Sequence, residues 1–367
     1  MIPYLDLKQI NLRHKEGLQS AFEQILESGW FILGSKLETF EKEYANFNNV
    51  THSVGLANGL DALILSLKAI GIQSGDEVIV PSNTYIASWL AISYVGAVPV
   101  PVEPRLDTYN INSERIFEKI NNRTKAIMPV NLYGQAAELD RIKQIAEDNG
   151  LYMVEDNAQA QGATCADVRT GAWGHINASS FYPGKNLGAL GDAGVITTNN
   201  DQLAEIIKVM RNYGSQRKYY NEIKGVNSRL DEIQAAFLSV KLAFLESDNS
   251  ERMRLAEVYQ NELANIWDLI LPKLAIGCNS VWHIYLIRTS LRNELQTYLN
   301  QNGVGTVIHY PVPPHLQQAY IELGYKKGDF PIAEIIADTC LSLPLYPGLT
   351  SEDQNKIISL IKQFYNA

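Results

Sequence analysis

Lys185 is the residue of this chain whose type and surroundings best suit covalent chemistry, and it lies in a glycine-rich stretch at residues 179–194. Its neighbours are small or apolar, so its ammonium group is poorly solvated and we expect its pKa to fall. A neutral amine can attack a carbonyl carbon and form a Schiff base. The glycines would let the backbone turn tightly and let a flat ligand approach. Taken alone, the stretch fits equally well a loop with a solvated lysine, so the rest of the chain must decide.

A possible anion site follows the apolar run at 54–56, which we read as a strand. Asn58 can cap the helix that comes next, and the amides of Gly59 and Leu60 would then point toward an incoming anion. A helix N-terminus with a glycine beside it is a typical phosphate site. A plain capped helix is the alternative, because such caps are common.

Two further strand ends carry side chains that could face a ligand. Tyr85 follows the predicted strand at 77–80 and could cover one face of a flat ring, or it could be a packed aromatic residue. Asn131 is polar at the end of an apolar strand at 126–130, which makes it a candidate for the same site.

The predicted strand at 152–155 ends in two carboxylates, Glu155 and Asp156. Side chains alternate along a strand, so these two should point in opposite directions. A carboxylate buried there costs free energy unless it meets a cation or a hydrogen-bond donor. A protonated ring nitrogen is one such partner, and a helix cap by Asp156 is the structural alternative.

Motifs that the chain lacks narrow the chemistry. No GxGxxG follows the first strands, and neither GxxxxGK[ST] nor GxSxG occurs, which disfavours a nicotinamide enzyme, a P-loop NTPase and an α/β-hydrolase. A helix-end anion site, an aromatic cover, Asp156 and the later Lys185 together favour pyridoxal phosphate. In that chemistry an aspartate keeps the pyridine nitrogen protonated, so that the ring acts as an electron sink.

Composition indicates an ordinary globular enzyme of about two domains: 367 residues, 46% hydrophobic and 19% charged, with a net charge of −9. This charge attracts neither nucleic acid nor an anionic membrane. Cys165, Cys278 and Cys340 show no CxxC spacing, which argues against a metal site or a disulfide framework and suits a reducing compartment. We find no signal peptide and no long apolar run, so we expect a cytoplasmic protein that binds no membrane.

The order of predicted elements indicates an α/β fold with a mainly parallel sheet covered on both faces, because strands alternate with helices up to residue 155. A helix over 9–29 precedes this part. Residues 214–225 should form a mobile loop, and one long helix over 230–264 should bridge two domains. We place the large domain at 1–240 and a smaller α+β domain at 241–367. The expected elements of the smaller domain are strands at 285–288 and 306–309 and helices at 291–302, 332–340 and 351–364.

In the stretches that contain the candidate site residues, the chain resembles the DegT/DnrJ/EryC1/StrS family of nucleotide-sugar aminotransferases. The motifs that carry the resemblance are NGLDAL at 58–63, EDNAQA at 155–160, FYPGK at 181–185 and NSRLDEIQAA at 227–236. The resemblance covers essentially the whole chain. It implies the pyridoxal-phosphate-dependent aspartate aminotransferase fold (fold type I), with a large, mostly parallel seven-stranded sheet domain and a smaller C-terminal domain.

The resemblance assigns roles around the cofactor ring. Lys185 would form the Schiff base and move protons between carbon atoms during transamination, and Asp156 would pair with the pyridine nitrogen. Gln159 would lie near the ring and its 3-oxygen, and Tyr85 would stack on the ring.

The resemblance also assigns the phosphate site. The helix start at Asn58, the amides of Gly59 and Leu60 and the hydroxyl of Ser180 would hold the phosphate. Asn227 matches a position that reaches the phosphate from the neighbouring subunit, so we expect a homodimer with shared active sites.

Within the family, residues 182–192 and the turn at 29–34 resemble enzymes that aminate C3 of dTDP-3-keto-6-deoxyhexoses of galacto or gluco configuration. L-Glutamate would be the amino donor, and the amino sugar would serve surface-glycan biosynthesis, such as O-antigen or lipopolysaccharide. Two alternatives stay open: amination of C4 of a dTDP- or UDP-4-keto sugar, and a non-catalytic sensor on the same fold. Many relatives have histidine where this chain has Asn131.

An acidic protein needs local cations to hold a nucleoside diphosphate. A basic cluster around the 214–225 loop could supply them, although such runs are often only solvated. Its members are Arg211, Arg217, Lys218, Lys224 and Arg229. Tyr219 and Tyr220 could add stacking to thymine or sugar. By resemblance, Tyr182, His309 and Tyr310 border the substrate pocket.

Overall fold

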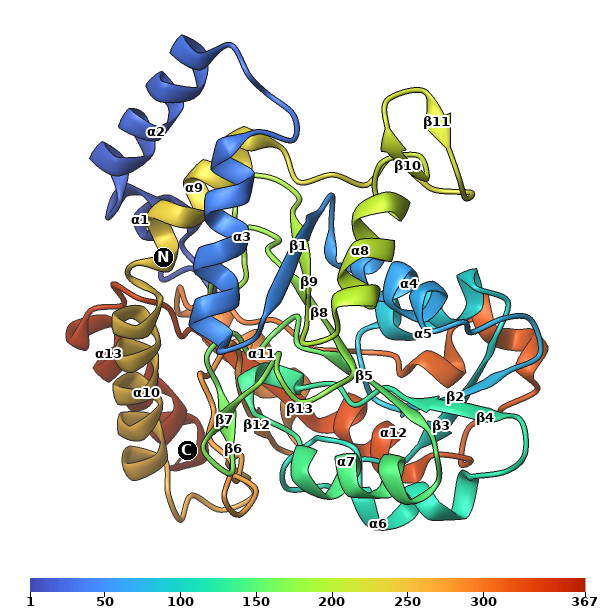
Figure 1. Ribbon diagram of the computed structural model, residues 1–367. Helices are drawn as coiled ribbons and strands as arrows, with labels where there is room; N and C mark the ends of the chain where they lie inside the picture. Colours follow the sequence, from blue (N-terminus) through green and yellow to red (C-terminus); the bar gives the residue numbers. More distant parts are fainter. Residues whose placement is uncertain (367) are drawn as a thin grey trace.

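The computed structural model describes residues 1–366 and has a large sheet at its centre (Figure 1). The sheet has seven strands, and only β9 runs antiparallel to its neighbours, which confirms the predicted mainly parallel sheet. Across the sheet the order is β1 (His52–Leu56), β9 (Gly194–Thr198), β8 (Ile176–Ser180), β5 (Tyr152–Asp156), β4 (Thr124–Ile127), β2 (Glu77–Pro81) and β3 (Val98–Val102).

Helices cover both faces of this sheet because its strands present apolar side chains alternately to each side. On β2, Val78 packs in one core cluster and Ile79 in another. The cluster around Val78 contains residues of α4 (Gly59–Ala69), α5 (Ile86–Tyr94) and α8 (Asp201–Met210). The cluster around Ile79 contains residues of α6 (Ser113–Ile116) and α7 (Leu139–Asp148). A third core joins α3 (Ser35–Asn48), α9 (Glu232–Leu242) and β9.

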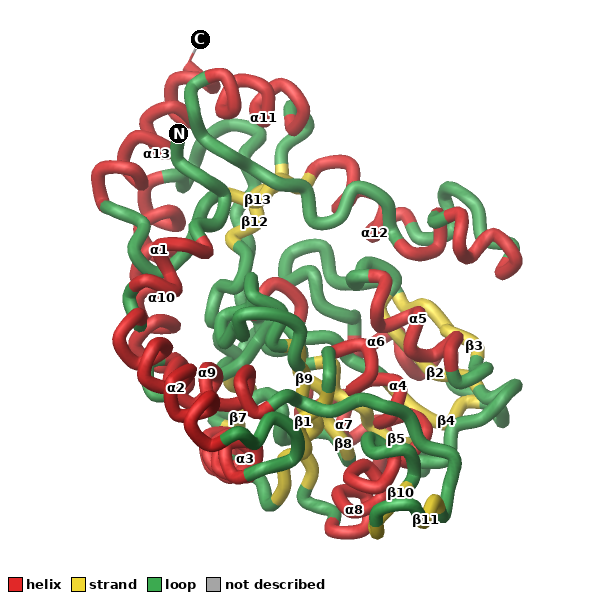
Figure 2. Tube along the Cα trace, turned by 90° about the horizontal axis from the view of Figure 1, so that it is seen from above, coloured by secondary structure: helices red, strands yellow, loops and turns green. Residues whose placement is uncertain are grey.

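The C-terminal part forms a separate core, the C-terminal core, beside the large sheet (Figure 2). Its strands β12 (Tyr285–Arg288) and β13 (Cys340–Leu343) pair antiparallel. The helices are α10 (Leu245–Glu262), α11 (Arg292–Gln301), α12 (Pro331–Thr339) and α13 (Ser351–Asn366).

The N-terminal residues join the C-terminal core rather than the large sheet. The Ile2 amide donates to the Gly303 carbonyl over 2.8 Å, and the Gly305 amide donates to the Ile2 carbonyl over 2.8 Å. The side chain of Ile2 is buried with that of Tyr285. The division at residue 240 stays a prediction, but the first residues of the chain pack with the C-terminal core.

The remaining elements are short or peripheral. They are α1 (Leu7–Leu12), α2 (Lys15–Ser28), β6 (Thr164–Cys165), β7 (Val168–Arg169), β10 (Ser215–Arg217), β11 (Tyr220–Asn221) and the 3-10 turns η1 (Phe117–Lys119), η2 (Leu132–Gly134), η3 (Pro314–Leu316) and η4 (Gln318–Leu323). In the part of the chain that is described, no helix combines the length and apolar character needed to cross a membrane.

Several predicted elements differ from the structure. The single helix over 230–264 is wrong, because the chain turns at residues 243–244 between α9 and α10. The two helices serve different cores: Ala236 packs with α2, whereas Leu255 packs with the C-terminal strands. The helix over 9–29 is likewise divided into α1 and α2. The strand at 306–309 is reduced to one isolated bridge between Val307 and Ser342.

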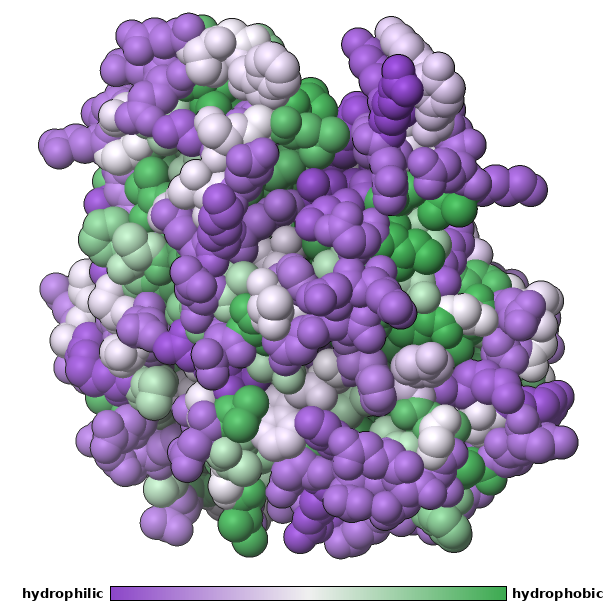
Figure 3. Space-filling model, viewed as in Figure 1, coloured by the Kyte–Doolittle hydropathy of each residue, from purple (hydrophilic) through white to green (hydrophobic). Residues whose placement is uncertain are grey.

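The surface carries apolar residues near two projections of the large domain. The turn between α2 and α3 exposes Trp30 and Phe31, and the β10–β11 hairpin exposes Tyr219 and Tyr220. In the view of Figures 1 and 3, α2 and this hairpin flank a notch, and hydrophobic surface lies beside the α2–α3 turn. Part of the predicted loop at 214–225 thus forms a hairpin, which consists of β10 and β11.

Candidate active site

Lys185 lies in the turn that follows β8, a strand that the sequence did not predict. Its amide donates to the Tyr182 carbonyl over 2.8 Å, which fixes the turn. Burial lowers the pKa of Lys185 to about 8, and the negative charge of Asp156 opposes this shift. A substantial fraction of the amine is therefore neutral near pH 8, as nucleophilic attack requires.

Asp156 lies at the end of β5, next to β8 in the sheet. Ser88 donates its hydroxyl to Oδ2 over 2.8 Å, and the Ala158 amide donates to Oδ1 over 3.1 Å. Burial raises the pKa of Asp156, while the hydrogen bond from Ser88, that from the Ala158 amide and the charge of Lys185 lower it. The site thus holds a carboxylate and an amine that act on each other electrostatically.

Glu155 points away from Asp156 and is fixed by hydrogen bonds. Its Oε1 accepts from Asn131 Nδ2 over 2.7 Å and from the Gly171 amide over 2.6 Å. Asn131 Oδ1 accepts from the Ala137 amide over 2.9 Å, and the Asn131 side chain is fully buried. Burial raises the pKa of Glu155 to about 7. Asn131 therefore anchors Glu155 and the 131–137 turn.

Gln159 connects the large domain to the segment at 309–310. Its Oε1 accepts from the Tyr133 amide over 2.7 Å, and its Nε2 donates to the Tyr310 hydroxyl over 3.0 Å. The ring of Tyr310 lies 5.3 Å from that of Tyr85, measured between centroids. Tyr85 is about half exposed, so it is free to present its face to a ligand.

The start of α4 and the end of β8 approach closely at Gly59. A Cβ atom on Gly59 would lie 2.5 Å from the Cβ of Ser180, a distance that real side chains do not tolerate. Asn58 caps the helix by accepting from the Asp61 amide over 2.8 Å. The first amides of α4, including those of Gly59 and Leu60, thus lie beside the Ser180 hydroxyl. This arrangement fits a phosphate group, because helix N-termini offer free N–H donors and a positive dipole end.

Two histidines lie close enough to Lys185 for its charge to act on them. His283 Nδ1 lies 3.2 Å from Asn186 Oδ1, and His309 Nδ1 lies 2.9 Å from Ser342 Oγ. Burial first, and then the charge of Lys185, lowers the pKa of His309 to about 4 and that of His283 well below its ordinary value. The sequence predicted His309 as a residue of the substrate pocket but did not predict His283. A single histidine before an apolar strand forms no sequence motif that would indicate a site.

The predicted substrate residues of the hairpin form contacts among themselves. The Arg217 guanidinium lies 4.7 Å from the ring centre of Tyr220, and Lys218 Nζ lies 5.2 Å from that of Tyr219. Asn227 is exposed. Within residues 1–366, no hydrogen bond or ion pair joins these side chains to Lys185 or Asp156.

Two other members of the predicted basic cluster already have partners. Arg211 is buried and donates to Glu41 and to the Gly55 carbonyl, so it is not available to a ligand. Its inclusion in the cluster was wrong, because the charge serves to tie α3 to β1. Arg229 donates to Asn212 Oδ1 over 3.1 Å. Tyr182, by contrast, is exposed beside Ser180.

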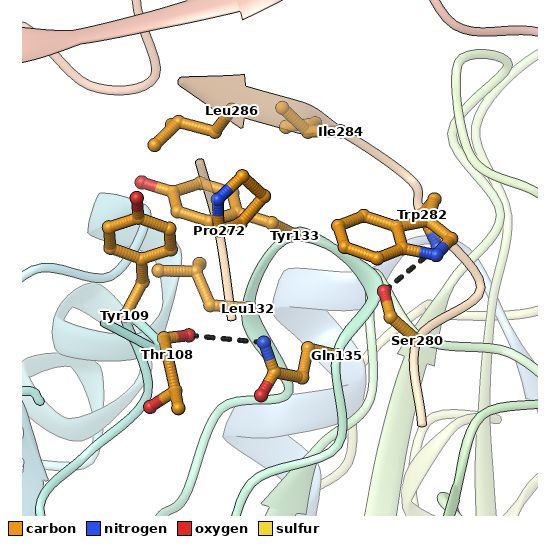
Figure 4. A pocket seen from close by; sticks show the side chains of 10 residues that line it. All are labelled: Thr108, Tyr109, Leu132, Tyr133, Gln135, Pro272, Ser280, Trp282, Ile284 and Leu286. Atoms are coloured by element: carbon orange, nitrogen blue, oxygen red, sulfur yellow. Dashed lines mark hydrogen bonds between the residues drawn. The ribbon is translucent and has the colours of Figure 1, made fainter. Parts of the chain in front are cut away.

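A small cavity lies behind Tyr133 and is drawn in Figure 4. Its volume of about 10 Å³ has room for about one water molecule and none for a cofactor or sugar. Tyr109, Leu132 and Tyr133 meet Ile284 and Leu286 there, so it marks the contact between the large domain and β12 rather than the ligand site. Among the described residues, no group of three or more His, Cys, Asp or Glu side chains is placed to hold a metal ion.

The fold and the site together define a pyridoxal-phosphate-dependent aminotransferase. The chain belongs to the DegT/DnrJ/EryC1/StrS aminotransferase family, whose model matches residues 13–362.

Among its relatives is the dTDP-3-amino-3,6-dideoxy-alpha-D-galactopyranose transaminase of Aneurinibacillus thermoaerophilus, with 49% identity over 99% of both chains. The erythromycin biosynthesis sensory transduction protein EryC1 of Saccharopolyspora erythraea is 47% identical over 98% of this chain and 99% of its own. The crystal structure of S. venezuelae DesV in complex with a ketimine intermediate matches with a TM-score of 0.98 and 44% identity, covering 100% of this chain and 99% of that one.

Proposed function

We propose that this enzyme transfers an amino group from L-glutamate to C3 of a dTDP-3-keto-6-deoxyhexose and forms a dTDP-3-amino-3,6-dideoxyhexose for surface-glycan synthesis. The observation that carries the proposal is the half-buried, partly neutral Lys185 beside Asp156 on a chain that resembles dTDP-3-amino-sugar transaminases along its whole length. The sugar would have galacto or gluco configuration; one relative is named for a 3-amino-3,6-dideoxygalactopyranose, and another for a 3-amino-3,4,6-trideoxyglucose, which lacks a C4 hydroxyl.

The cofactor and the side chains around it would have different roles in the reaction. Bound pyridoxal phosphate supplies an electron sink that stabilises negative charge on the carbon next to the amino nitrogen. Asp156 would hold a proton on the ring nitrogen, Tyr85 would cover the ring face, and Gln159 would lie near the 3-oxygen. Neutral Lys185 removes a proton from the donor carbon as general base and returns it as general acid.

The phosphate and the sugar nucleotide are held by separate groups. Ser180 and the first amides of α4 would hold the cofactor phosphate through O–H and N–H donors. Tyr182, His309 and Tyr310 border the sugar. Arg217, Lys218 and Arg229 supply positive charge for the diphosphate on a protein whose net charge is −9.

We also propose that the active enzyme is a homodimer in which Asn227 completes the phosphate site of the neighbouring subunit. Support comes from the exposure of Asn227 and from the exposed aromatic residues Trp30, Phe31, Tyr219 and Tyr220 on the two projections. Exposed apolar groups gathered in this way are typical of a protein interface.

The proposed reaction can be tested first by the absorbance of the purified protein and then by analysis of the product. The purified protein should absorb near 400 nm, and L-glutamate should bleach that band. Turnover with dTDP-3-keto-6-deoxygalactose and its gluco epimer, followed by NMR of the product, should place nitrogen on C3. No absorbance, or a band that glutamate leaves unchanged, would refute the transaminase; nitrogen on C4 would refute only the regiochemistry.

A sensory role is the second candidate, because two relatives carry regulatory names: EryC1 and the pleiotropic regulatory protein of Geobacillus stearothermophilus, which is 41% identical. Lys185→Ala separates the two functions. It should abolish transamination, and a biological activity that survives this substitution would support the sensor.

A further inference from the structure

Cys165 and Cys278 lie 113 positions apart in the sequence, yet their side chains meet in the fold. Cys165 ends β6, and Cys278 lies in the segment that leads to β12. Their sulfur atoms are 2.6 Å apart, well inside van der Waals contact. Cys340, in β13, has no cysteine partner among the described residues.

The backbone around the two cysteines has the geometry that favours a cross-strand disulfide. Cys165 and Cys278 face each other in an isolated antiparallel bridge. The Ala166 amide donates to the Gly277 carbonyl and the Asn279 amide donates to the Thr164 carbonyl, both over 2.8 Å. These bonds flank the pair, so the cysteines occupy a non-hydrogen-bonded position, where Cα atoms are about 4.5 Å apart and side chains are closest. Disulfides accept Cα separations of roughly 4.4–6.8 Å.

We propose that Cys165 and Cys278 form a reversible disulfide bond when the enzyme meets a low-molecular-weight disulfide such as oxidised glutathione. The Cys278 thiolate attacks one sulfur of the small disulfide, which forms a mixed disulfide and expels one small thiolate. The Cys165 thiolate then attacks the sulfur of Cys278 and expels the second small thiolate. The two protein thiols lose two electrons and two protons, and the small disulfide gains both to become two thiols.

The order of attack follows from exposure and hydrogen bonding. Cys278 is half-buried and reachable, whereas Cys165 is buried. The S–H group of Cys278 points to the sulfur of Cys165, and this hydrogen bond lowers the pKa of Cys165 and raises that of Cys278. Access from solvent, not acidity, therefore makes Cys278 the first to attack, through the minor fraction of its thiol that has lost the proton. Cys165 therefore suits the second, resolving attack, which needs a thiolate but no access from solvent.

The bond would hold a segment that also supports the active site. The Val281 amide donates to the Gly134 carbonyl over 2.9 Å, and Asn186, next to Lys185, donates to the Val281 carbonyl over 3.0 Å. The Ala136 amide donates to the Asn279 carbonyl over 3.1 Å. The disulfide bond would thus join β6 covalently to the segment that carries His283. It should stabilise the fold because it reduces the conformational entropy of the unfolded chain.

The test exposes the full-length holoenzyme to oxidised or reduced glutathione and then titrates free thiols after denaturation. The wild type has three cysteines, so we expect one free thiol after oxidation, no glutathione adduct, and a cross-linked peptide containing Cys165 and Cys278. Cys340→Ser is the matched control and should still form the cross-link. Cys165→Ser and Cys278→Ser should not.

Thermal unfolding gives a second readout. The melting temperature of the oxidised wild type and of Cys340→Ser should rise by roughly 2 °C or more, and dithiothreitol should reverse the rise. Three free thiols in the oxidised wild type, a lasting adduct on Cys278 without a cross-link, or a cross-link through Cys340 would each overturn the proposal.

Discussion

At the scale of single residues, burial decides which protonation states are available around Lys185. The same low solvation that lowers the pKa of Lys185 keeps His309 neutral and raises the pKa of Glu155. The two carboxylates at the end of β5 thereby have different tasks: Asp156 faces the amine, while Glu155 binds backbone amides and Asn131.

The pKa of Lys185 can be measured in the protein freed of cofactor. Competitive labelling with acetic anhydride at several pH values should give a midpoint of about 8, because burial disfavours the ammonium form. The neutral, reactive fraction should grow as pH rises through that value. Asp156→Asn should lower the midpoint further, since the charge of Asp156 raises it. A midpoint near 10.4, as for a solvated lysine, would contradict the placement.

Asn131 should matter for stability. Asn131→Ala removes a buried donor to Glu155 and an acceptor for the Ala137 amide, so the free energy of unfolding should fall by about 2 kcal/mol. Denaturant titration measures this loss. Asn149→Ala is the control: its exposed side chain bonds only the Ile145 carbonyl, and the change should stay within about 0.5 kcal/mol. Equal losses of unfolding free energy in both variants would show that the buried hydrogen bonds of Asn131 do not stabilise the fold.

At the scale of elements, the close approach of α4 and β8 is the feature that forms the anion site. It depends on Gly59, because a Cβ there would collide with Ser180. The sequence predicted the capped helix and the glycine, but not β8, whose residues Asn177 to Ser180 are small or polar and show no strand periodicity.

Gly59→Ala should weaken cofactor binding at least about tenfold, because the added methyl group pushes the helix start away from Ser180. Equilibrium titration with pyridoxal phosphate, followed by absorbance, measures the change. Gly184→Ala is the matched control, since its Cβ would meet nothing closer than 3.4 Å. Comparable weakening in the two variants would mean that the contact between α4 and β8 does not shape the site.

Local patterns predicted much of the element order and the strand-end candidates Asp156, Gly59 and Tyr85, because hydrophobic periodicity and caps are local properties. Contacts between distant segments could not be predicted in this way. The break between α9 and α10 has no glycine or proline to signal it, and it reflects two separate cores. The antiparallel direction of β9, the approach of His283 to Lys185 and the pairing of Cys165 with Cys278 likewise depend on tertiary packing.

At the scale of the whole molecule, the described part of one chain shows no polar contact between Lys185 and either the hairpin residues or Asn227. The proposed dimer would bring them to the site of the neighbouring subunit. A shared site can be tested by mixing two inactive variants, because only a dimer that combines residues from both chains could restore activity.

Lys185→Ala and Asn227→Ala should each have little activity alone, yet a mixture of the two should recover activity after subunit exchange. In a mixed dimer one site loses both groups and the other keeps both, so an equal mixture should reach about one quarter of wild-type activity. Light scattering and native mass spectrometry would confirm exchange. If mixed dimers form and stay inactive, Asn227 acts within its own chain.

The hydrogen bonds between Ile2 and the segment at 303–305 also constrain the order in which this protein can mature on the ribosome. Ile2 leaves the exit tunnel long before Gly303, and the core that covers it includes Ile357 and Ile361 of the last helix. The large sheet has all seven of its strands by residue 198 and can fold early, as domains do during translation. The first residues must wait, unpaired and open to chaperones or proteases, until the segments at 303–305 and 357–361 have been synthesised.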